Sequence, residues 1–338
     1  MNPPAVSVIM PVFNAEKSLS AAVRSILDQT HSNIELIAVN DGSNDRSKDI
    51  LENFAAKDDR IKPVHTGHLG ITNALNTGLQ EASARFAARM DADDISFPGR
   101  ISEQLSAFDN FQEAGLICSS VEFGKNGHIN EGYRLYTEWL NNLSGTKDIL
   151  ENRFVESPVA HPSVMLKKPE YGGWPEYRPG DFPEDYDLWL RLFEKGTIPV
   201  KINRPLIRWN DSEKRLSRND ERYSGKAFLE CKLPFLSRWL KKNTAGRKLK
   251  VWGAGKISRK YTSFLLKENI KIAEIIDIDP KKTGREWRGI KVVKPQKAIL
   301  KDGSFILPTV QSRGAGEKIE KTLIKNGLSR GRDYIRAA

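Results

Sequence analysis

Several features are scarce in this chain of 338 residues, and each scarcity excludes a class of protein or of site. It has only two cysteines, Cys118 and Cys231, which lie far apart without His or Cys at metal-ligand spacing. Two isolated thiols are typical of core packing in a reducing cytoplasm, not of a disulfide framework or a zinc site. No apolar run approaches the roughly 20 residues that cross a bilayer, and no secretion signal is visible. We therefore expect a folded cytoplasmic protein.

Acidic residues are scarce in one part of the chain. Residues 239–338 carry 25 Lys and Arg against 9 Asp and Glu, whereas residues 1–238 carry 29 against 34. This asymmetry and the length predict about two domains, of which the second can meet an anionic surface. Anionic lipid, nucleic acid and an acidic partner all fit, and so does a plainly solvated basic surface. We predict domains at 1–225 and 248–338.

A connecting segment at residues 226–247 separates the two predicted domains. Its mixture of apolar and basic residues indicates a helix. We expect this helix to break near Pro234, because proline removes a backbone hydrogen bond in a helix interior.

Strand-like and helix-like segments alternate in the first domain. Residues 6–10 and 34–39 are apolar runs typical of buried strands, and residues 19–26 and 47–56 have helical periodicity. This alternation predicts an α/β fold with a mostly parallel sheet covered on both faces. In such sheets ligands bind beyond the carboxyl ends of the strands.

Polar side chains follow three of these predicted strands. Asn14 comes after the first and Asp41 after the second, and the strand near residue 86 is followed by the carboxylates of Asp91, Asp93 and Asp94. Grouped carboxylates repel one another, so folding alone gives little reason to keep them together. Mg²⁺ and Mn²⁺ prefer oxygen ligands and often join protein carboxylates to substrate phosphates. An acidic turn that caps the next helix is the alternative.

The order and spacing of the motifs over about residues 5–220 resemble the family 2 glycosyltransferases, which are inverting enzymes of GT-A fold. The matching residues are Pro11-Val12-Phe13-Asn14, Asn40-Asp41-Gly42-Ser43 with Asp45, Gly70 with Asn76 and Gly78, Asp91-Ala92-Asp93-Asp94, Pro98, Arg100, Gln104, His161-Pro162-Ser163 and Glu184-Asp185-Tyr186-Asp187-Leu188-Trp189. The resemblance implies a nucleotide-diphospho-sugar transferase fold and a nucleoside diphosphate sugar as donor, with a UDP-sugar expected.

The resemblance implies that one group of residues binds the nucleotide sugar and its metal. Asp41 would meet the nucleobase, and its alternative is a turn-forming role. Asp93, together with Asp91, would hold the Mn²⁺ or Mg²⁺ at the two phosphates. Arg215 can clamp the diphosphate, although the His that family members carry near this segment is missing. The implied donor-binding set is Pro11, Val12, Phe13, Asn14, Asp41, Asn76, Asp91 and Arg215.

A second group is implied on the acceptor side. A base must take the proton of the attacking hydroxyl, and a carboxylate can do so in a single displacement. The resemblance makes Asp185 this base and gives Glu184 a role in the acceptor site. The alternative is an acidic helix start, which the helix dipole favours. His161 and Trp174 are expected at the acceptor site, with packing roles as their alternatives.

The second domain resembles small Rossmann-like domains appended to some bacterial sugar transferases and methyltransferases. Gly253-Ala254-Gly255 followed by Ser258 is only part of a dinucleotide fingerprint. Asp277 lies where such a fingerprint places a ribose-binding acid. Nucleotide or sugar-nucleotide binding, docking on a membrane surface and a structural role all remain open for this domain.

These observations predict a metal-dependent inverting glycosyltransferase of hexosyl or N-acetylhexosaminyl type. Its acceptor would be a hydroxyl of a glycan or lipid-linked molecule in bacterial surface polysaccharide synthesis, with peripheral contact to the inner membrane face through the basic domain. A sugar nucleotidyltransferase is one alternative, but it would need a Gly-rich, Arg-containing loop after the first strand. A non-catalytic protein that binds a membrane surface or a sugar nucleotide is another. No interleaved aromatic and basic pattern indicates nucleic acid.

Overall fold

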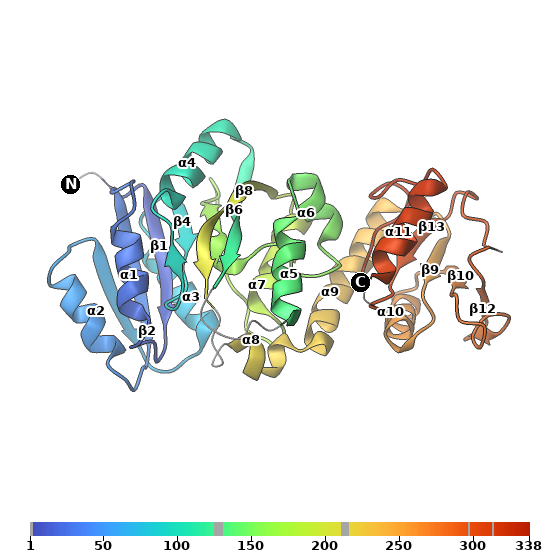
Figure 1. Cartoon of the computed structure of the whole chain (residues 1–338), viewed down its shortest axis with the longest axis horizontal. Coiled ribbons are helices and arrows are strands. Elements are labelled where there is room, and N and C mark those ends of the chain that lie inside the picture. Colours follow the sequence, from blue (N-terminus) through green and yellow to red (C-terminus); the bar gives the residue numbers. More distant parts are fainter. Residues whose placement is uncertain (1–2, 125–130, 211–215, 297, 313) are drawn as a thin grey trace. The chain divides into compact units, whose positions relative to one another are not determined.

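The computed structural model describes residues 3–124, 131–210, 216–296, 298–312 and 314–338, and they form two compact units (Figure 1). The first unit comprises Met1–Ile149 and Val159–Ala227, and the second comprises Leu150–Pro158 and Phe228–Ala338. The second unit thus includes a short stretch from the middle of the chain, which the predicted bounds do not include. Among the described helices, none is both long and apolar enough to span a bilayer.

The first unit is built on an eight-stranded sheet with the order β3-β2-β1-β4-β7-β6-β8-β5. β1 pairs in parallel with β2 and β4, β2 with β3, and β6 with β8, while β7 runs antiparallel to β4 and β6, and β5 to β8. The predicted α/β fold is confirmed. The strands are β1 Val6–Val12, β2 Ile34–Asp41, β3 Ile61–Thr66, β4 Phe86–Arg89, β5 Ile95–Ser96, β6 Ala114–Phe123, β7 Met165–Lys167 and β8 Ile198–Trp209.

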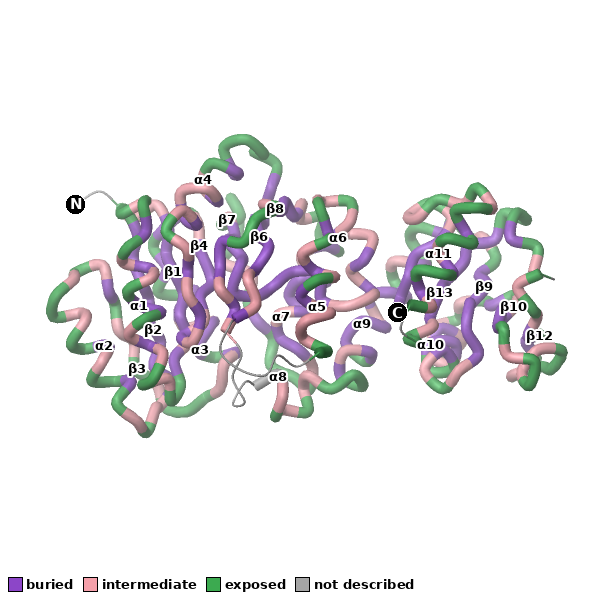
Figure 2. Tube along the Cα trace, in the orientation of Figure 1, coloured by how far each residue is buried: buried purple, intermediate pink, exposed green. Residues whose placement is uncertain are grey.

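Helices pack on this sheet through apolar faces that the sequence pattern indicates. Leu19, Ala22, Val23 and Ile26 of α1 are buried, as their spacing predicts. All residues of β2 are buried, and Figure 2 shows the inner strands as buried. The helices are α1 Leu19–Leu27, α2 Ser47–Ala55, α3 Ile71–Glu81, α4 Arg100–Asn110, α5 Glu131–Asn141, α6 Thr146–Asn152, α7 Glu184–Glu194 and α8 Leu216–Asn219, with 3₁₀ turns at His161–Ser163 and Glu221–Tyr223.

The second unit has a smaller sheet with the order β11-β12-β10-β9-β13. All its neighbours are parallel except β11 and β12, which form an antiparallel hairpin. Its core includes Trp252, Ile276, Ile306 and Leu323. The elements are α9 Gly225–Asn243, β9 Leu249–Trp252, α10 Lys256–Lys267, β10 Ile272–Ile276, β11 Glu286–Trp287, β12 Ile290–Val293, β13 Phe305–Pro308 and α11 Ala315–Lys325.

The expected break at Pro234 is wrong, because α9 is one helix with Pro234 inside it. An interior proline costs a helix about 3 kcal/mol. Leu233, Phe235 and Leu236 are buried next to it, and each buried side chain of this size contributes about 1.5–3 kcal/mol. Burial on both sides of the proline therefore outweighs its cost.

Lys232 joins α9 to two other segments of the second unit by hydrogen bonds. Its buried ammonium donates to the backbone carbonyls of Phe154 (2.8 Å), Val155 (3.1 Å) and Ala337 (2.9 Å). Burial lowers the pKa of Lys232 to about 8. The carbonyl oxygens satisfy the three donors that burial takes from water, so the middle stretch and the last residues of the chain are tied to α9.

Candidate active site

The carboxyl ends of β1, β2 and β4 lie at one edge of the first sheet, because these strands pair in parallel. Asn14 follows β1, Asp41 ends β2, and Asp91 and Asp93 follow β4. The structure thus brings the predicted donor-side residues to the edge where parallel sheets bind ligands.

The loops after β1 and β2 are joined by hydrogen bonds. Asn14 has a φ of 49°, in the left-handed region that asparagine tolerates. Its backbone N–H donates to Ser43 Oγ (3.0 Å), and its side-chain oxygen accepts from the N–H of Asn44 (2.8 Å). Pro11 and Val12 are the last residues of β1, and Val12 is fully buried. Val12 therefore anchors this loop through packing.

Asp41 is buried and fixes the loop that precedes α3. One carboxylate oxygen accepts from the N–H of Leu69 (2.8 Å) and the other from the N–H of Gly70 (2.9 Å). His68 lies beside it, with Nδ1 3.2 Å from Asp41 Oδ2. The ring of Phe13, 44% exposed, stacks on His68 with centroids 4.2 Å apart. An exposed aromatic pair therefore stands next to the predicted nucleobase-binding acid.

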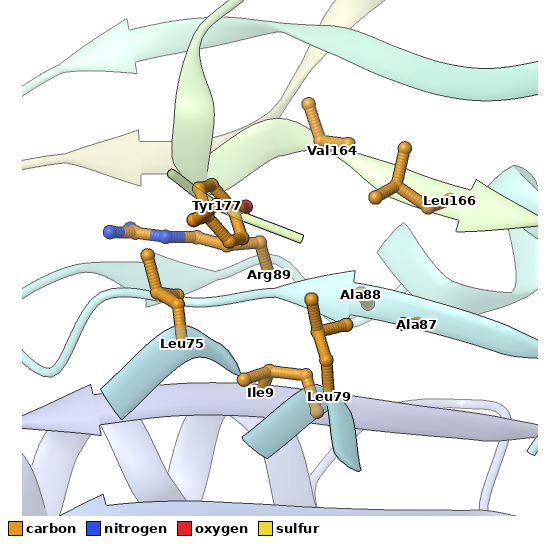
Figure 3. A pocket seen from close by; sticks show the side chains of 9 residues that line it. All are labelled: Ile9, Leu75, Leu79, Ala87, Ala88, Arg89, Val164, Leu166 and Tyr177. Carbon is orange, nitrogen blue, oxygen red and sulfur yellow. The ribbon is translucent and has the colours of Figure 1, made fainter. Parts of the chain in front are cut away.

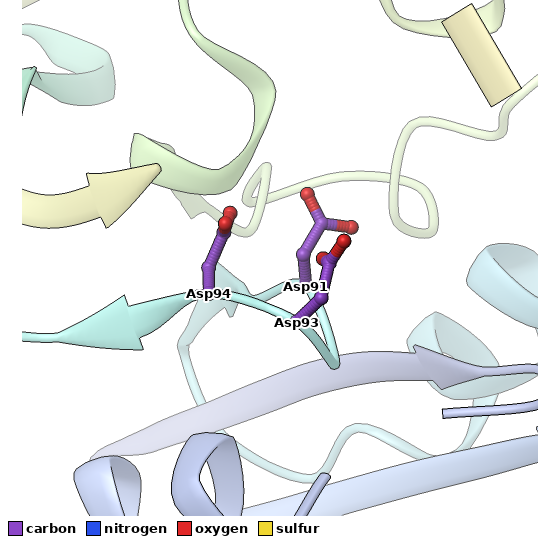
Figure 4. Close-up of side chains that lie close together, drawn as sticks. All are labelled: Asp91, Asp93 and Asp94. Atoms are coloured by element: carbon purple, nitrogen blue, oxygen red, sulfur yellow. The ribbon is translucent and has the colours of Figure 1, made fainter. Parts of the chain in front are cut away.

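Three carboxylates gather in the loop after β4 (Figure 4). One ligand atom from each of Asp91, Asp93 and Asp94 lies within 4.8 Å of the others. Asp94 Oδ1 accepts from the N–H of Asn210 (2.8 Å), whose side chain donates to the backbone carbonyl of Asp93 (2.7 Å). Asn210 thus holds the loop against the end of β8. Three carboxylates make an all-oxygen donor set, which fits Mg²⁺ or Mn²⁺.

Glu184 and Asp185 begin α7. The buried Glu184 accepts from the hydroxyl of Tyr223 (2.6 Å), and the half-buried Asp185 accepts from the N–H of Tyr186 (2.7 Å). Burial, and then the neighbouring charge of Glu184, raises the pKa of Asp185 to about 7. Burial also raises the pKa of Glu184. A carboxylate whose pKa lies near the working pH is suited to accept a proton.

A buried arginine, Arg89, interacts with both acidic groups, by an ion pair with one and by its charge on the other. It ends β4, forms an ion pair with Asp91, and its positive charge opposes the rise in the pKa of Asp185. Figure 3 shows its guanidinium extending beside Tyr177. The two side chains border an apolar pocket whose other lining residues are Ile9, Leu75, Leu79, Ala87, Ala88, Val164 and Leu166. Arg89 therefore couples the carboxylate loop to the start of α7.

His161 and Asn76 both position Tyr177. His161 Nε2 is hydrogen-bonded to the Tyr177 hydroxyl (2.7 Å). Burial lowers the pKa of His161 well below its usual value, so the imidazole is neutral. The amide of Asn76 donates to the Tyr177 carbonyl (2.8 Å) and accepts from its N–H (2.8 Å). The structure therefore shows that Asn76 positions Tyr177, and its contact with the donor stays a prediction.

The described contact of Trp174 lies elsewhere in the first unit. The ring of Trp174 lies 5.7 Å from Lys168 Nζ, and Lys168 bonds through its N–H to the Arg85 carbonyl just before β4 begins. This is the end of β4 opposite to Asp91, and the acceptor contact expected of Trp174 stays a prediction. Arg215 lies outside the described residues.

Sequence reasoning missed Arg89, Tyr177, Tyr223 and His68. Arg89 directly follows an apolar segment and lies two residues before Asp91, where the acidic run begins. This position is the signal by which the sequence could have indicated a role for Arg89. Tyr177 and Tyr223 lie in segments without a recognisable pattern. Their contacts with Asn76 and Glu184 join positions far apart in the sequence.

In the second unit, the glycine-rich turn closes on the predicted ribose-binding acid. Asp277 is buried and accepts from the N–H of Ala254 (2.6 Å). Gly253 has a φ of 132°, and a Cβ there would lie 2.4 Å from Ser258 Oγ. Ser258 therefore occupies the space that a side chain at Gly253 would need.

Asn76→Ala is expected to lower the free energy of unfolding by about 2 kcal/mol, because two partly buried hydrogen bonds are lost at about 1 kcal/mol each. Urea unfolding of the whole chain would measure this change. Asn73→Ala is the matched control, since exposed Asn73 lies on the same helix and its hydrogen bond among the described residues goes to the Leu69 carbonyl. Equal destabilisation by both variants would contradict a specific role for Asn76.

Comparison with known proteins agrees with this geometry. Residues 7–169 match the model described as glycosyl transferase family 2, and residues 245–332 match the model described as C2185-like, N-terminal. The first unit is therefore similar to glycosyl transferase family 2 over most of its length.

Two relatives and one solved structure illustrate the likeness. An uncharacterized glycosyltransferase of Haemophilus influenzae is 32% identical over 58% of this chain and 62% of its own length. The O-antigen biosynthesis glycosyltransferase WbnJ of Escherichia coli is 29% identical over 71% of this chain and 90% of its own. The crystal structure of S. aureus TarS 1–349 in complex with UDP-GlcNAc has 15% identity and a TM-score of 0.48, and the match covers 78% of this chain and 71% of that one.

Proposed function

We propose that this chain transfers a sugar, with inversion, from a nucleoside diphosphate sugar to a hydroxyl of a glycan or lipid-linked acceptor. A UDP-sugar is the proposed donor, and bacterial surface polysaccharide synthesis in the cytoplasm is the proposed setting. Two observations carry the proposal: Asp91 and Asp93 lie close together with Arg89 paired to Asp91, and the charge of Arg89 also acts on Asp185. The likeness to a relative named for O-antigen biosynthesis supports the setting.

On the donor side, Asp91 and Asp93 would hold Mn²⁺ or Mg²⁺. When bound, the cation would neutralise negative charge on the departing diphosphate. Arg89 orients Asp91 by their ion pair, and Asn210 fixes the backbone at Asp93. Phe13 and His68 offer the nucleobase an aromatic surface beside Asp41.

On the acceptor side, Asp185 would take the proton of the attacking hydroxyl. Its half-buried carboxylate can meet a substrate, while its backbone contact at Tyr186 holds its orientation. Glu184 stays in place because Tyr223 donates to it. One base and one leaving-group site imply a single displacement, which inverts the anomeric carbon.

The rate of transfer is expected to rise with pH through about 7, because Asp185 must be ionised to act and its pKa is raised to about 7. Glu184→Gln removes the neighbouring negative charge that helps to raise the pKa of Asp185. The increase of the rate with pH should therefore begin at lower pH in this variant than in the unchanged protein. Initial rates measured against pH for both proteins test this. A rate independent of pH around neutrality would contradict Asp185 as the base.

The proposed function is tested by a thermal-shift screen of nucleotide sugars with Mn²⁺, followed by a transfer assay with the best donor. A bound donor raises the melting temperature by mass action. We expect stabilisation by one class of nucleotide sugar, and its loss with a chelator. Formation of a nucleotide sugar from a nucleoside triphosphate and a sugar 1-phosphate, with release of pyrophosphate and without transfer, would instead favour the nucleotidyltransferase.

A further inference from the structure

Arg89 is a buried arginine whose hydrogen-bonding capacity is only partly used within the protein. Its residue is 6% exposed, and its Nε has no hydrogen-bond partner among the residues that the structure describes. Its Nη1 meets Asp91 as an ion pair. Buried donors in folded proteins are nearly always satisfied, because an unsatisfied one costs stability. Folding alone therefore does not account for this side chain, and the oxygen of a bound ligand can supply the missing acceptor.

The guanidinium of Arg89 points out of the apolar pocket that its stem lines. Figure 3 shows its nitrogens turned away from Ala87 and Leu166, which also line this pocket. Arg89 is the last residue of β4, and the loop with the three carboxylates follows it (Figure 4). Its polar end is therefore at the edge of the sheet where parallel strands bind ligands.

Arg89 interacts with both sides of the proposed reaction site. It pairs with Asp91 on the metal side, and its positive charge opposes the rise in pKa that burial causes at Glu184 and Asp185. Because the attraction between charges weakens with distance, Arg89 lies near both groups. In the proposed reaction, the transferred sugar joins the diphosphate at the metal to the hydroxyl that Asp185 deprotonates. The sugar must therefore bind beside Arg89.

A sugar hydroxyl fits the pair of Arg89 and Asp91 better than a phosphate does. A guanidinium only donates hydrogen bonds and a carboxylate only accepts them, whereas a hydroxyl does both. The carboxylate of Asp91 also offsets the positive charge of Arg89, so a phosphate gains less from this pair than from an unpaired arginine. The chemistry of the pair thus favours the neutral part of the donor.

We propose that Arg89 binds a hydroxyl of the sugar that is transferred and so helps to select the donor. A site that hydrogen-bonds a particular hydroxyl discriminates strongly against the analogue that lacks it, because the buried donor is then left unpaired. A sugar with its hydroxyl in another orientation should be rejected for the same reason. This inference rests on the proposed function and adds a residue that chooses the donor sugar.

The test compares a nucleotide with its sugar conjugates. The full chain with Mn²⁺ is titrated calorimetrically with UDP, UDP-glucose, UDP-galactose and UDP-N-acetylglucosamine, and in the same way with GDP and GDP-mannose. We expect one nucleotide sugar to bind more tightly than its nucleotide. Arg89→Lys keeps the positive charge beside Asp91 but loses the planar fork of donors. It should weaken binding of that nucleotide sugar by about 10- to 100-fold, while the affinity for the nucleotide changes little.

Donors that lack single hydroxyls identify the group that Arg89 binds. In the unchanged protein, loss of that hydroxyl should weaken binding about as much as Arg89→Lys does, and the two losses should not add. The matched control is Arg85→Lys, because Arg85 is exposed and lies just before β4 begins; it should keep every affinity. If Arg89→Lys lowers the melting temperature strongly, Arg89→Gln, which keeps an N–H donor, gives the same comparison.

Two results would overturn the inference and leave the proposed function standing. Equal losses of affinity for the nucleotide and for its sugar conjugate in Arg89→Lys would assign Arg89 to the phosphates or the metal. Unchanged affinity for every nucleotide sugar in this variant would remove Arg89 from the donor site. A third result is different in kind: if the unchanged protein binds none of these nucleotides or nucleotide sugars, the proposed function itself fails, and the inference fails with it.

Discussion

Asp185→Asn is expected to lower kcat by about a hundred- to ten-thousandfold, the usual contribution of a general base, while the affinity for the donor is retained. The amide keeps the shape of the carboxylate and can accept from the Tyr186 N–H as the carboxylate does, but it cannot take a proton from the acceptor. Steady-state transfer rates, together with donor titration by thermal shift, measure both effects.

The stability of the same variant separates the base from a simple helix cap. The pKa of Asp185 is raised above its usual value, so the folded state disfavours the charged form, and this loss of stability grows as pH rises above the ordinary aspartate range. Removing the charge should therefore leave the protein equally or more stable at neutral pH. A helix cap would instead lose about 1 kcal/mol on substitution.

Asp181→Asn, at an exposed position before α7, is the matched control and should change neither rate nor stability. A clear loss of stability in Asp185→Asn with full turnover would establish the cap and remove the base.

Asp93→Ala is expected to abolish transfer and the stabilisation that a nucleotide sugar gives in the presence of Mn²⁺. Asp91 is held by Arg89, and Asp94 accepts from Asn210, so the loop keeps its shape while the cation site loses a carboxylate. Thermal shift with donor and Mn²⁺, compared with donor and chelator, reports the loss directly. The melting temperature without ligand should change little.

Asp109→Ala is the control for this experiment, because Asp109 is an exposed carboxylate on α4. It removes the same charge from the same unit without touching the loop after β4. Full transfer activity in Asp93→Ala would refute the metal assignment, whatever the control does.

Residues at the ends of parallel strands could be predicted from the sequence, whereas contacts between distant loops could not. Asp41 and Asp91 were placed because buried strands have a clear apolar pattern and polar residues follow them. The pairing of Asn76 with Tyr177 spans a sequence separation of 101 residues and involves a backbone with no regular structure. No local pattern encodes such a contact.

Arg89 and Pro234 show two other limits of the sequence. Arg89 directly follows an apolar segment, and a charged residue is not expected at the end of a buried strand. Its ion pair with Asp91 accounts for the position, and this pair is known only from the structure. Pro234 predicts a broken helix by local preference, but tertiary burial on both sides keeps α9 whole. Local rules failed where the ion pair of a buried arginine or the packing of neighbouring side chains decided the outcome.

The three backbone carbonyls that accept hydrogen bonds from Lys232 affect which fragments of the chain can be expressed in folded form. An expression fragment that begins at α9 would contain the lysine and Ala337 but lack Phe154 and Val155. Its ammonium would then lose two of three acceptors, and the fragment should be recovered as aggregate unless residues 150–158 are supplied as a separate peptide. We therefore expect the second unit to need residues 150–158, as well as residues 228–338, in order to fold.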